Sequence, residues 1–225
     1  MSANFMGEPT DKLTYKLLKQ TYKPQFVNIN VEFGDSEVFL VDGDALLLHL
    51  LNLNKNVSCS SLHLIFLMEV FLHQFIKRSG KFSLIFFSDN EGNWSSTTNF
   101  SKLLLLRTAV VYHFQNATDI DVLTKYESPF DEDFTNHVQE NKPTFILSSF
   151  EQKEERKITR KTLTFLQFQS LGINFAEIEE MSMDVATISA WFCTSSTLPP
   201  DIQKHLLHQH LKLEIIKQTV KFESG

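Results

Sequence analysis

The sequence is poor in the residues that several protein classes require. It has 7 Gly, 2 Cys, 4 Tyr and 2 Trp in 225 residues. The two cysteines, Cys59 and Cys193, are too few for a disulfide scaffold or a zinc ribbon. Neither a G-x-x-x-x-G-K-[ST] loop nor a D-E-x-H strand is present, and so few glycines leave little material for a loop that cradles phosphates. A P-loop motor is therefore not expected.

An excess of positive charge is also missing. The chain has 21 Lys and Arg against 27 Asp and Glu, a net charge of −6, which argues mildly against a dedicated nucleic-acid binder. The N-terminus shows no basic region followed by an apolar run, so no signal peptide is expected. The most apolar stretch, residues 62–76, is interrupted by His63, Glu69 and His73 and fits a buried helix better than a membrane span. We expect a cytoplasmic protein without a membrane partner.

Phenylalanine is abundant, with 21 residues. Because its side chain has no polar group, most of these rings should lie in a core rather than stack on bases. The hydrophobic content of 42% and charged content of 21% are ordinary for a soluble globular protein. We expect an N-terminal tail or docking segment over 1–35, one α/β domain over 36–198 and a C-terminal helix over 199–225.

Short apolar runs of strand length alternate with helical patterns along the chain. The predicted strands are Val38–Val41, Phe82–Phe87, Ile120–Leu123, Thr144–Ser149 and Ile173–Ile178. The predicted helices are Ala45–Leu53, Ser61–Arg78, Lys102–Phe114, Asp131–Glu140, Glu151–Leu171, Asp184–Phe192 and a segment from Pro199 to about Lys221. Continuous apolar strands are typical of a sheet that is covered on both faces. The alternation therefore predicts a three-layer α/β/α sandwich with a mostly parallel sheet.

Acidic residues follow several of the predicted strands. Asp42 and Asp44 follow the first, Asp89 follows the second, and Asp184 begins the helix after the last. Sites in parallel sheets form outside the carboxyl ends of the strands, and carboxylates that converge there suit Mg²⁺ or Mn²⁺. These four residues are the predicted metal ligands. Ions held in this way can activate water and stabilise the leaving oxygen in phosphodiester cleavage.

Each of these acids also has a purely structural interpretation. Asp44 and Asp184 each begin a helix and are suited to cap it. Asp89 lies in the turn-prone segment SDNEG. Asp42 is the strongest functional candidate, because it ends a buried strand and precedes Gly43, which allows a ligand or another chain to approach closely.

Four stretches together resemble the N-terminal region of the interferon-induced, Ski2-like DExD/H-box helicase 60 family: FLVDGDALLL, GKFSLIFFSDNEG, LLLLRTAVVYHFQNATDIDV and PTFILSSFEQ. The resemblance runs from about Glu37 to Pro200 and implies a PIN-like domain, a fold shared with metal-dependent nucleases. The family's helicase motor is missing, so the chain would be a fragment, a truncated isoform or a free-standing paralogue. The resemblance implies a setting in antiviral innate immunity, with RNA, a helicase or innate-immunity proteins as partners and no DNA.

The resemblance also assigns residues and shows one departure. Asp42 matches the first-strand acid of PIN nucleases, Asp89 falls after the next apolar strand, and Asp184 is the last acid. The resemblance implies that these three are the catalytic residues if the site is active. Residues 148–150, Ser-Ser-Phe, stand where an active PIN domain usually carries Asp, and Glu151 is displaced from that position. Loss of one carboxylate lowers the charge of a metal cluster, so the resemblance implies an inactive or weakly active site.

One basic stripe lies on a predicted helix. Its members, at helical spacing, are Lys153, Arg156, Lys157, Arg160 and Lys161. They are the predicted RNA-binding residues, since such a stripe can follow a phosphate backbone. The alternative is a solvated helix face whose charge is balanced by neighbouring glutamates.

Three hypotheses therefore remain open. The first is a degenerate PIN-like module that binds RNA or protein, without ATPase or helicase activity. The second is a ribonuclease that depends on Mg²⁺ or Mn²⁺. The third is a purely structural or interaction domain in which the acids serve only turns and helix caps.

Overall fold

The computed structural model describes residues 25–28, 38–53, 60–77, 80–90, 100–148, 164–165, 167–178 and 188–191. The chain divides into two compact units, residues 1–193 and 194–225, and every described residue belongs to the first. Within the described ranges, no helix is long and apolar enough to cross a membrane.

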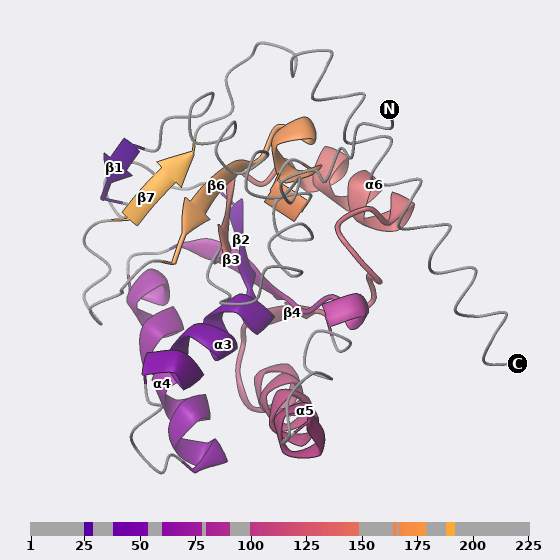
Figure 1. Ribbon diagram of the computed structural model, residues 1–225. Coiled ribbons are helices and arrows are strands. Elements are labelled where there is room, and N and C mark those ends of the chain that lie inside the picture. The colour runs from indigo at the N-terminus through magenta and orange to yellow at the C-terminus, as the bar shows by residue number, and fades with distance from the viewer. Residues whose placement is uncertain are drawn as a thin grey trace, which may run out of the picture. The chain divides into compact units, whose positions relative to one another are not determined.

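One sheet of seven strands forms the centre of the fold, in the order β1-β7-β6-β5-β2-β3-β4 (Figure 1). The strands are β1 (Gln25–Val27), β2 (Val38–Asp42), β3 (Lys81–Ile85), β4 (Asp121–Leu123), β5 (Phe145–Ser148), β6 (Asn174–Glu177) and β7 (Ile188–Trp191). The five strands from β6 to β4 are parallel, whereas β7 pairs antiparallel with both β6 and β1. The predicted, mostly parallel sheet is confirmed.

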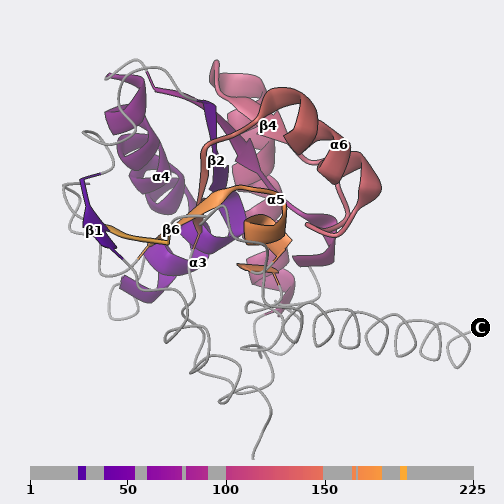
Figure 2. The same cartoon turned by 90° about the horizontal axis from the view of Figure 1, so that it is seen from above.

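Helices cover both faces of this sheet, as the view from above shows (Figure 2). The first face carries α3 (Gly43–Leu53), α4 (Ser61–Ile76) and α5 (Phe100–Ala117). The second face carries α6 (Glu132–Asn141) and the helical residues 164–165 and 167–170. The predicted three-layer α/β/α architecture is thus confirmed, with helix ends within a few residues of the predicted ones.

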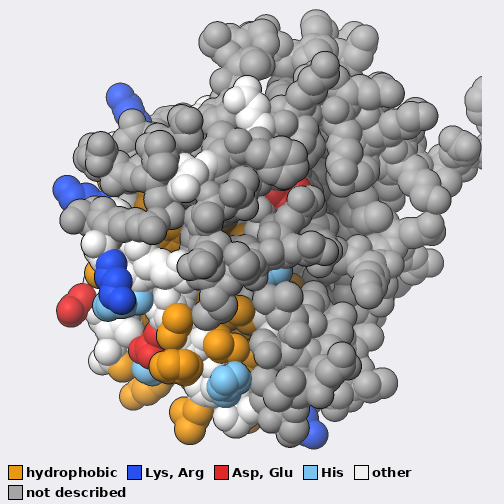
Figure 3. Space-filling view, turned by 90° about the vertical axis from the view of Figure 1, so that its left-hand side faces the viewer, with side chains coloured by type: hydrophobic (Ala, Val, Ile, Leu, Met, Phe, Trp, Pro, Cys, Tyr) orange, Lys and Arg blue, Asp and Glu red, His pale blue; other side chains and the backbone are white. Residues whose placement is uncertain are grey.

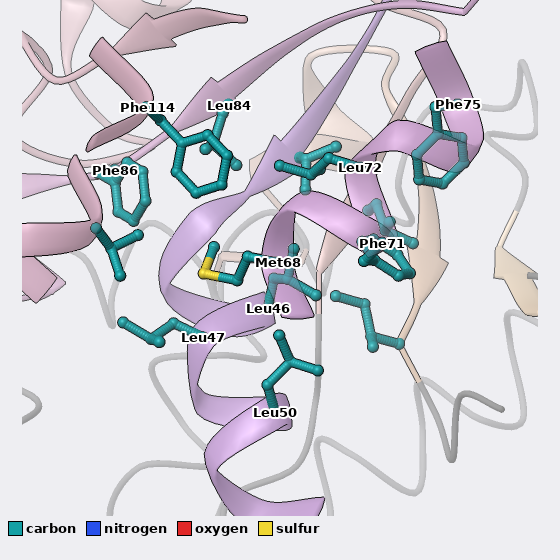
Figure 4. Packing of buried hydrophobic residues seen from close by; sticks show 14 of the residues in the cluster. Leu46, Leu47, Leu50, Met68, Phe71, Leu72, Phe75, Leu84, Phe86 and Phe114 are labelled. Carbon is teal, nitrogen blue, oxygen red and sulfur yellow. The ribbon is translucent and has the colours of Figure 1, made fainter. Parts of the chain in front are cut away.

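The first core packs leucine and phenylalanine side chains between the sheet and α3, α4 and α5. Figure 4 shows Leu46, Leu47 and Leu50 of α3 facing Met68, Phe71 and Leu72 of α4, with Leu84 of the sheet and Phe114 of α5 closing the cluster. On β2, Phe39 and Val41 belong to this core, so the alternation of side chains along the strand turns Leu40 and Asp42 to the opposite face.

The second core is mainly aromatic. Phe134 of α6 lies edge-on against Phe87, Tyr126 and Phe168, with ring centroids 5.2, 5.5 and 6.2 Å away. Phe168 in turn stacks on Phe175 of β6. Eleven phenylalanines of the described part are buried, so the prediction that Phe builds the core is confirmed.

Local signals explain where α4 and α6 begin and end. Ser60 caps α4 by accepting a hydrogen bond from the backbone N–H of His63, and Asp131 caps α6 through the N–H of Asp133. After α6, Lys142 adopts a left-handed conformation with φ 47°, and Pro143 follows, which a helix cannot accommodate there.

One predicted helix is wrong. The segment predicted as a helix, Asp184–Phe192, contains the strand β7, whose residues pair with β6 on one side and β1 on the other. Hydrogen bonds to two neighbouring strands satisfy its backbone, and such pairing with distant segments outweighs a weak helical pattern. Its partner β1 comes from the segment predicted as a tail or docking segment, so part of residues 1–35 belongs to the sheet.

Two other predicted helices fall largely or wholly on residues outside the described ranges. Of Glu151–Leu171, the described residues 164–165 and 167–170 are helical. The segment from Pro199 to Lys221 lies entirely outside the described part of the chain. The predicted domain boundaries at 35 and 198 stay predictions.

Candidate functional site

Three polar side chains lie in a row at the carboxyl ends of neighbouring strands. Asp42 ends β2, Ser148 ends β5 and Glu177 ends β6. The pairing of β2 with β5 places Ser148 beside Asp42, and Ser148 and Glu177 are direct partners across β5 and β6. All three side chains are buried, with 8%, 5% and 4% of their surface exposed. This is the edge at which parallel sheets form their sites, as the sequence predicts.

Asp42 is held by two hydrogen bonds from the protein itself. Its Oδ1 accepts the backbone N–H of Ala45 at 2.9 Å, and its Oδ2 accepts the hydroxyl of Ser148 at 2.7 Å. Because α3 begins at Gly43, the bond to Ala45 makes Asp42 the N-cap of this helix. The expectation that Asp44 caps the helix is wrong, since α3 begins two residues earlier than predicted.

Asp44 instead forms a buried ion pair with Arg107 of α5. The Arg107 Nε donates to Asp44 Oδ1 at 2.7 Å, and its Nη2 donates to Asp44 Oδ2 at 3.2 Å. The same Nη2 donates to the carbonyl of Phe87 at 3.0 Å, and Asn90 Nδ2 donates to Asp44 Oδ2 at 3.1 Å. One guanidinium therefore joins the first turn of α3, the helix α5 and the segment that follows β3.

The electrostatics of Asp44 reflect its burial. Burial raises the pKa of its carboxyl from 3.8 to about 6, because the charged form loses its water. The hydrogen bonds and charge of Arg107 act in the opposite direction and favour the charged form, while the nearby Asp42 carboxylate disfavours it. Asp42 and Asp44 thus lie close enough for their charges to interact. The negative charge of Asp44 is balanced by the guanidinium of Arg107.

Gly43 serves packing at this edge. A Cβ on Gly43 would meet ring atoms of Phe86 at 2.3–2.7 Å, so the position has room only for hydrogen. The guanidinium of Arg107 lies 5.5 Å from the centroid of the same ring, within the range of a cation–π contact. The sequence predicts that a ligand or another chain approaches Gly43 closely. In the structure it is the Phe86 side chain of the core that does so.

The structure brings Asp42 and Asp44 together. Asp89 lies half-buried in the turn at residues 88–90. Its backbone N–H donates to the carbonyl of Glu127 at 2.9 Å. Asp184 lies outside the described residues. So does the predicted RNA-binding stripe, Lys153, Arg156, Lys157, Arg160 and Lys161. Among the residues that the structure describes, no three His, Cys, Asp or Glu side chains come together to hold a metal ion. The predicted set of four ligands therefore stays a prediction.

Sequence reasoning missed Arg107, Asn90 and Glu177 as members of this edge. For Arg107 a signal existed: it stands three residues before Val110 and seven before Phe114, on the face of α5 that is buried. A charged side chain on a buried helix face requires a partner of opposite charge. The identity of that partner, 63 residues away along the chain, could not be read from local spacing.

A sequence model for the PIN-like domain of the ATP-dependent RNA helicase DDX60 matches residues 8–222 of the chain. The chain belongs to this family. A human relative, probable ATP-dependent RNA helicase DDX60-like, is 31% identical over a region that covers 62% of this chain and 8% of the relative. The uncharacterized helicase C28H8.3 of Caenorhabditis elegans is 25% identical, over 77% of this chain and 12% of the relative. The chain thus spans about a tenth of the length of these curated relatives.

Among solved structures, this chain is similar to human GEN1, which was crystallised in complex with Holliday junction DNA. The TM-score is 0.50 at 9% sequence identity, and the similar region covers 79% of this chain and 42% of GEN1. At this identity the likeness shows the fold alone. Together with the parallel sheet, it confirms the predicted PIN-like α/β fold.

Replacement of Gly43 by Ala should destabilise the fold by about 1–3 kcal/mol, because the new methyl group overlaps the Phe86 ring. In a background with Phe86→Leu, which removes most of that ring, the same replacement should cost less. Urea unfolding of the four chains of this double-mutant cycle measures the difference. An equal cost in both backgrounds would show that the ring does not set the requirement for glycine.

The free energy of unfolding should depend on pH, because the pKa of Asp44 differs between the folded and the unfolded chain. Between pH 4 and 6 the folded chain retains a proton on this carboxyl that the unfolded chain has lost, so stability falls as the pH rises. Relative to Asp44→Asn, which cannot titrate, the wild type should lose about 3 kcal/mol across this window. Urea unfolding of both chains at a series of pH values measures this. If the free energy of unfolding of the wild type instead rose relative to that of Asp44→Asn as the pH increased, Arg107 would hold the pKa of Asp44 below its ordinary value.

Proposed function

We propose that the chain is a PIN-like module that binds RNA without cutting it. The observation that carries this proposal is that two carboxylates at the carboxyl edge of the sheet are already bound by groups of the protein. Asp42 is held by a backbone amide and the Ser148 hydroxyl, and Asp44 is held by Arg107 and Asn90.

Cleavage with metal assistance requires carboxylate oxygens that bind the ion. Here both oxygens of Asp42 and both of Asp44 accept hydrogen bonds at 2.7–3.2 Å. A divalent ion would have to share these oxygens with the Ser148 hydroxyl and the Arg107 guanidinium. It would also have to bind next to a buried positive charge, since Arg107 already occupies the position at which the acids need a cation.

The proposal of RNA as the ligand rests on two supports. The family to which the chain belongs is described as a domain of an RNA helicase. The sequence also predicts a basic stripe on one helix face, which includes Arg156 and Arg160. A cytoplasmic location and a setting in antiviral immunity are part of the same proposal, and they rest on the resemblance of the sequence alone.

The experiment is a binding titration of labelled single-stranded RNA in the presence of millimolar Mn²⁺, followed by recovery of the RNA on a gel. Wild type should bind, and the RNA should be recovered intact. The double variant Arg156→Glu with Arg160→Glu should bind at least tenfold more weakly, because two phosphate contacts are replaced by repulsion.

The matched control is Lys77→Glu with Lys102→Glu, which changes the net charge by the same amount at two exposed positions outside the stripe. This control should bind close to wild type. Equal losses in both double variants would show that net charge alone governs binding. RNA breakdown that stops with a chelator and with Asp42→Asn would establish the ribonuclease instead. Absence of RNA binding would leave a protein as the ligand.

A further inference from the structure

The helix α4 has apolar side chains on two faces, and only one of them is buried. Its buried face, with Leu64, Ile65, Met68, Phe71, Leu72 and Phe75, packs in the first core. On the opposite side, Leu62, Phe66 and Ile76 are 78%, 56% and 44% exposed. Figure 3 looks at the side of the molecule on which α4 lies and shows apolar side chains gathered on its lower part, with histidines among them.

The exposed residues follow the spacing of a helix seam. Leu62, Phe66, Glu69, His73 and Ile76 are separated by four, three, four and three residues, which is the a/d spacing of two heptads. We call these five residues the outer stripe. On a helix that rises 1.5 Å per residue they form one line about 21 Å long. These residues therefore share one face of the helix, and Leu62, Phe66 and Ile76 give that face the apolar side chains that pack against another helix.

The outer stripe is unlike a face that is meant for solvent. In the whole of α4, Glu69 is the one Asp, Glu, Lys or Arg among sixteen residues. By contrast, the exposed residues of α6 are Glu132, Asp133, Asn136, Gln139, Glu140 and Asn141, all polar. Large apolar side chains that are exposed together on one helix face are typical of an interaction surface. Nucleic acid does not fit the outer stripe either, because the stripe offers no Lys or Arg to a phosphate.

The position of Glu69 disfavours a second copy of this chain as the partner of the outer stripe. It stands at the midpoint of the outer stripe, so two copies that paired through the stripe would bring Glu69 against Glu69, whether the helices ran parallel or antiparallel. Like charges opposite each other in a helix interface oppose pairing. The side chain of Glu69 is 40% exposed, and its Oε1 lies 2.7 Å from His113 Nε2, which fixes its position at the surface. The facing helix should therefore carry a Lys or Arg at its own midpoint.

We infer that the outer stripe docks a helix of the helicase part of the polypeptides in which this family carries the domain, with a basic residue of that helix facing Glu69. The region similar to this chain makes up only 8% and 12% of the length of the two curated relatives, so most of each of these polypeptides lies outside the domain. Two heptads are a small interface for a free partner, but a tethered segment acts at a high effective concentration. Interfaces between domains of one chain are commonly of this modest size.

The experiment is site-specific photocrosslinking within the human relative, in which this chain replaces the region similar to it, so that the tether is kept. The chain carries the variant Phe66→p-benzoylphenylalanine, and the matched control carries the same photoreactive residue at Gln139, an exposed position of α6. Position 66 should give a covalent adduct with the helicase part, and position 139 should not. Adding Glu69→Lys to the position-66 chain should reduce the adduct about fivefold to tenfold, and Glu69→Gln should reduce it less.

Thermal unfolding accompanies each chain. Position 66 is exposed and its variant should keep the wild-type midpoint, whereas Glu69 is half-buried and bonded to His113, so the Glu69 variants are crosslinked at a temperature at which they are fully folded. Three results would overturn the inference. These are no adduct with the helicase part from position 66, an equal adduct from position 139, and an adduct that joins two copies of this chain. The proposed RNA binding does not enter these results, so either proposal can fail alone.

Discussion

The buried ion pair between Asp44 and Arg107 is the interaction on which the carboxyl edge of the sheet depends. Two charges removed from water are costly unless each finds its partner with good geometry, and here the guanidinium meets both carboxylate oxygens and a backbone carbonyl. Loss of either partner would leave an uncompensated buried charge. The pair therefore keeps the first turn of α3, the helix α5 and the end of β3 in one arrangement.

The surrounding residues fit around this pair. Gly43 leaves space for Phe86, and the Phe86 ring lies beneath the guanidinium. Asp42, which would otherwise add a second negative charge without a partner, is bound by the Ser148 hydroxyl and by the first turn of α3. A fold shared with nucleases thus keeps acids at the edge of its sheet while the protein supplies their hydrogen bonds and their counter-charge. This arrangement supports the proposal that the domain binds without cleaving.

Much of the fold could be predicted from the sequence, because its strands are buried on both faces and appear as continuous apolar runs. The same logic placed Asp42 at the carboxyl edge. The helix predicted over Asp184–Phe192 failed because the strand β7 is stabilised by pairing with β1, which comes from near the start of the chain. The role of Asp44 was missed for a similar reason: its partner lies in another helix, and only the folded sheet brings the two together. Local patterns report burial well, but they do not report which distant residue completes a charge pair.

The account rests on the claim that groups of the protein already satisfy the acids at this edge. Thermal unfolding of the wild type with and without millimolar Mn²⁺, beside Asp42→Asn, tests it most directly, because an ion that binds only the folded state raises the stability of that state. The account predicts the same midpoint with and without Mn²⁺ in the wild type. A rise of the wild-type midpoint with Mn²⁺ that Asp42→Asn abolishes would contradict it, since Asp42 would then be a metal ligand.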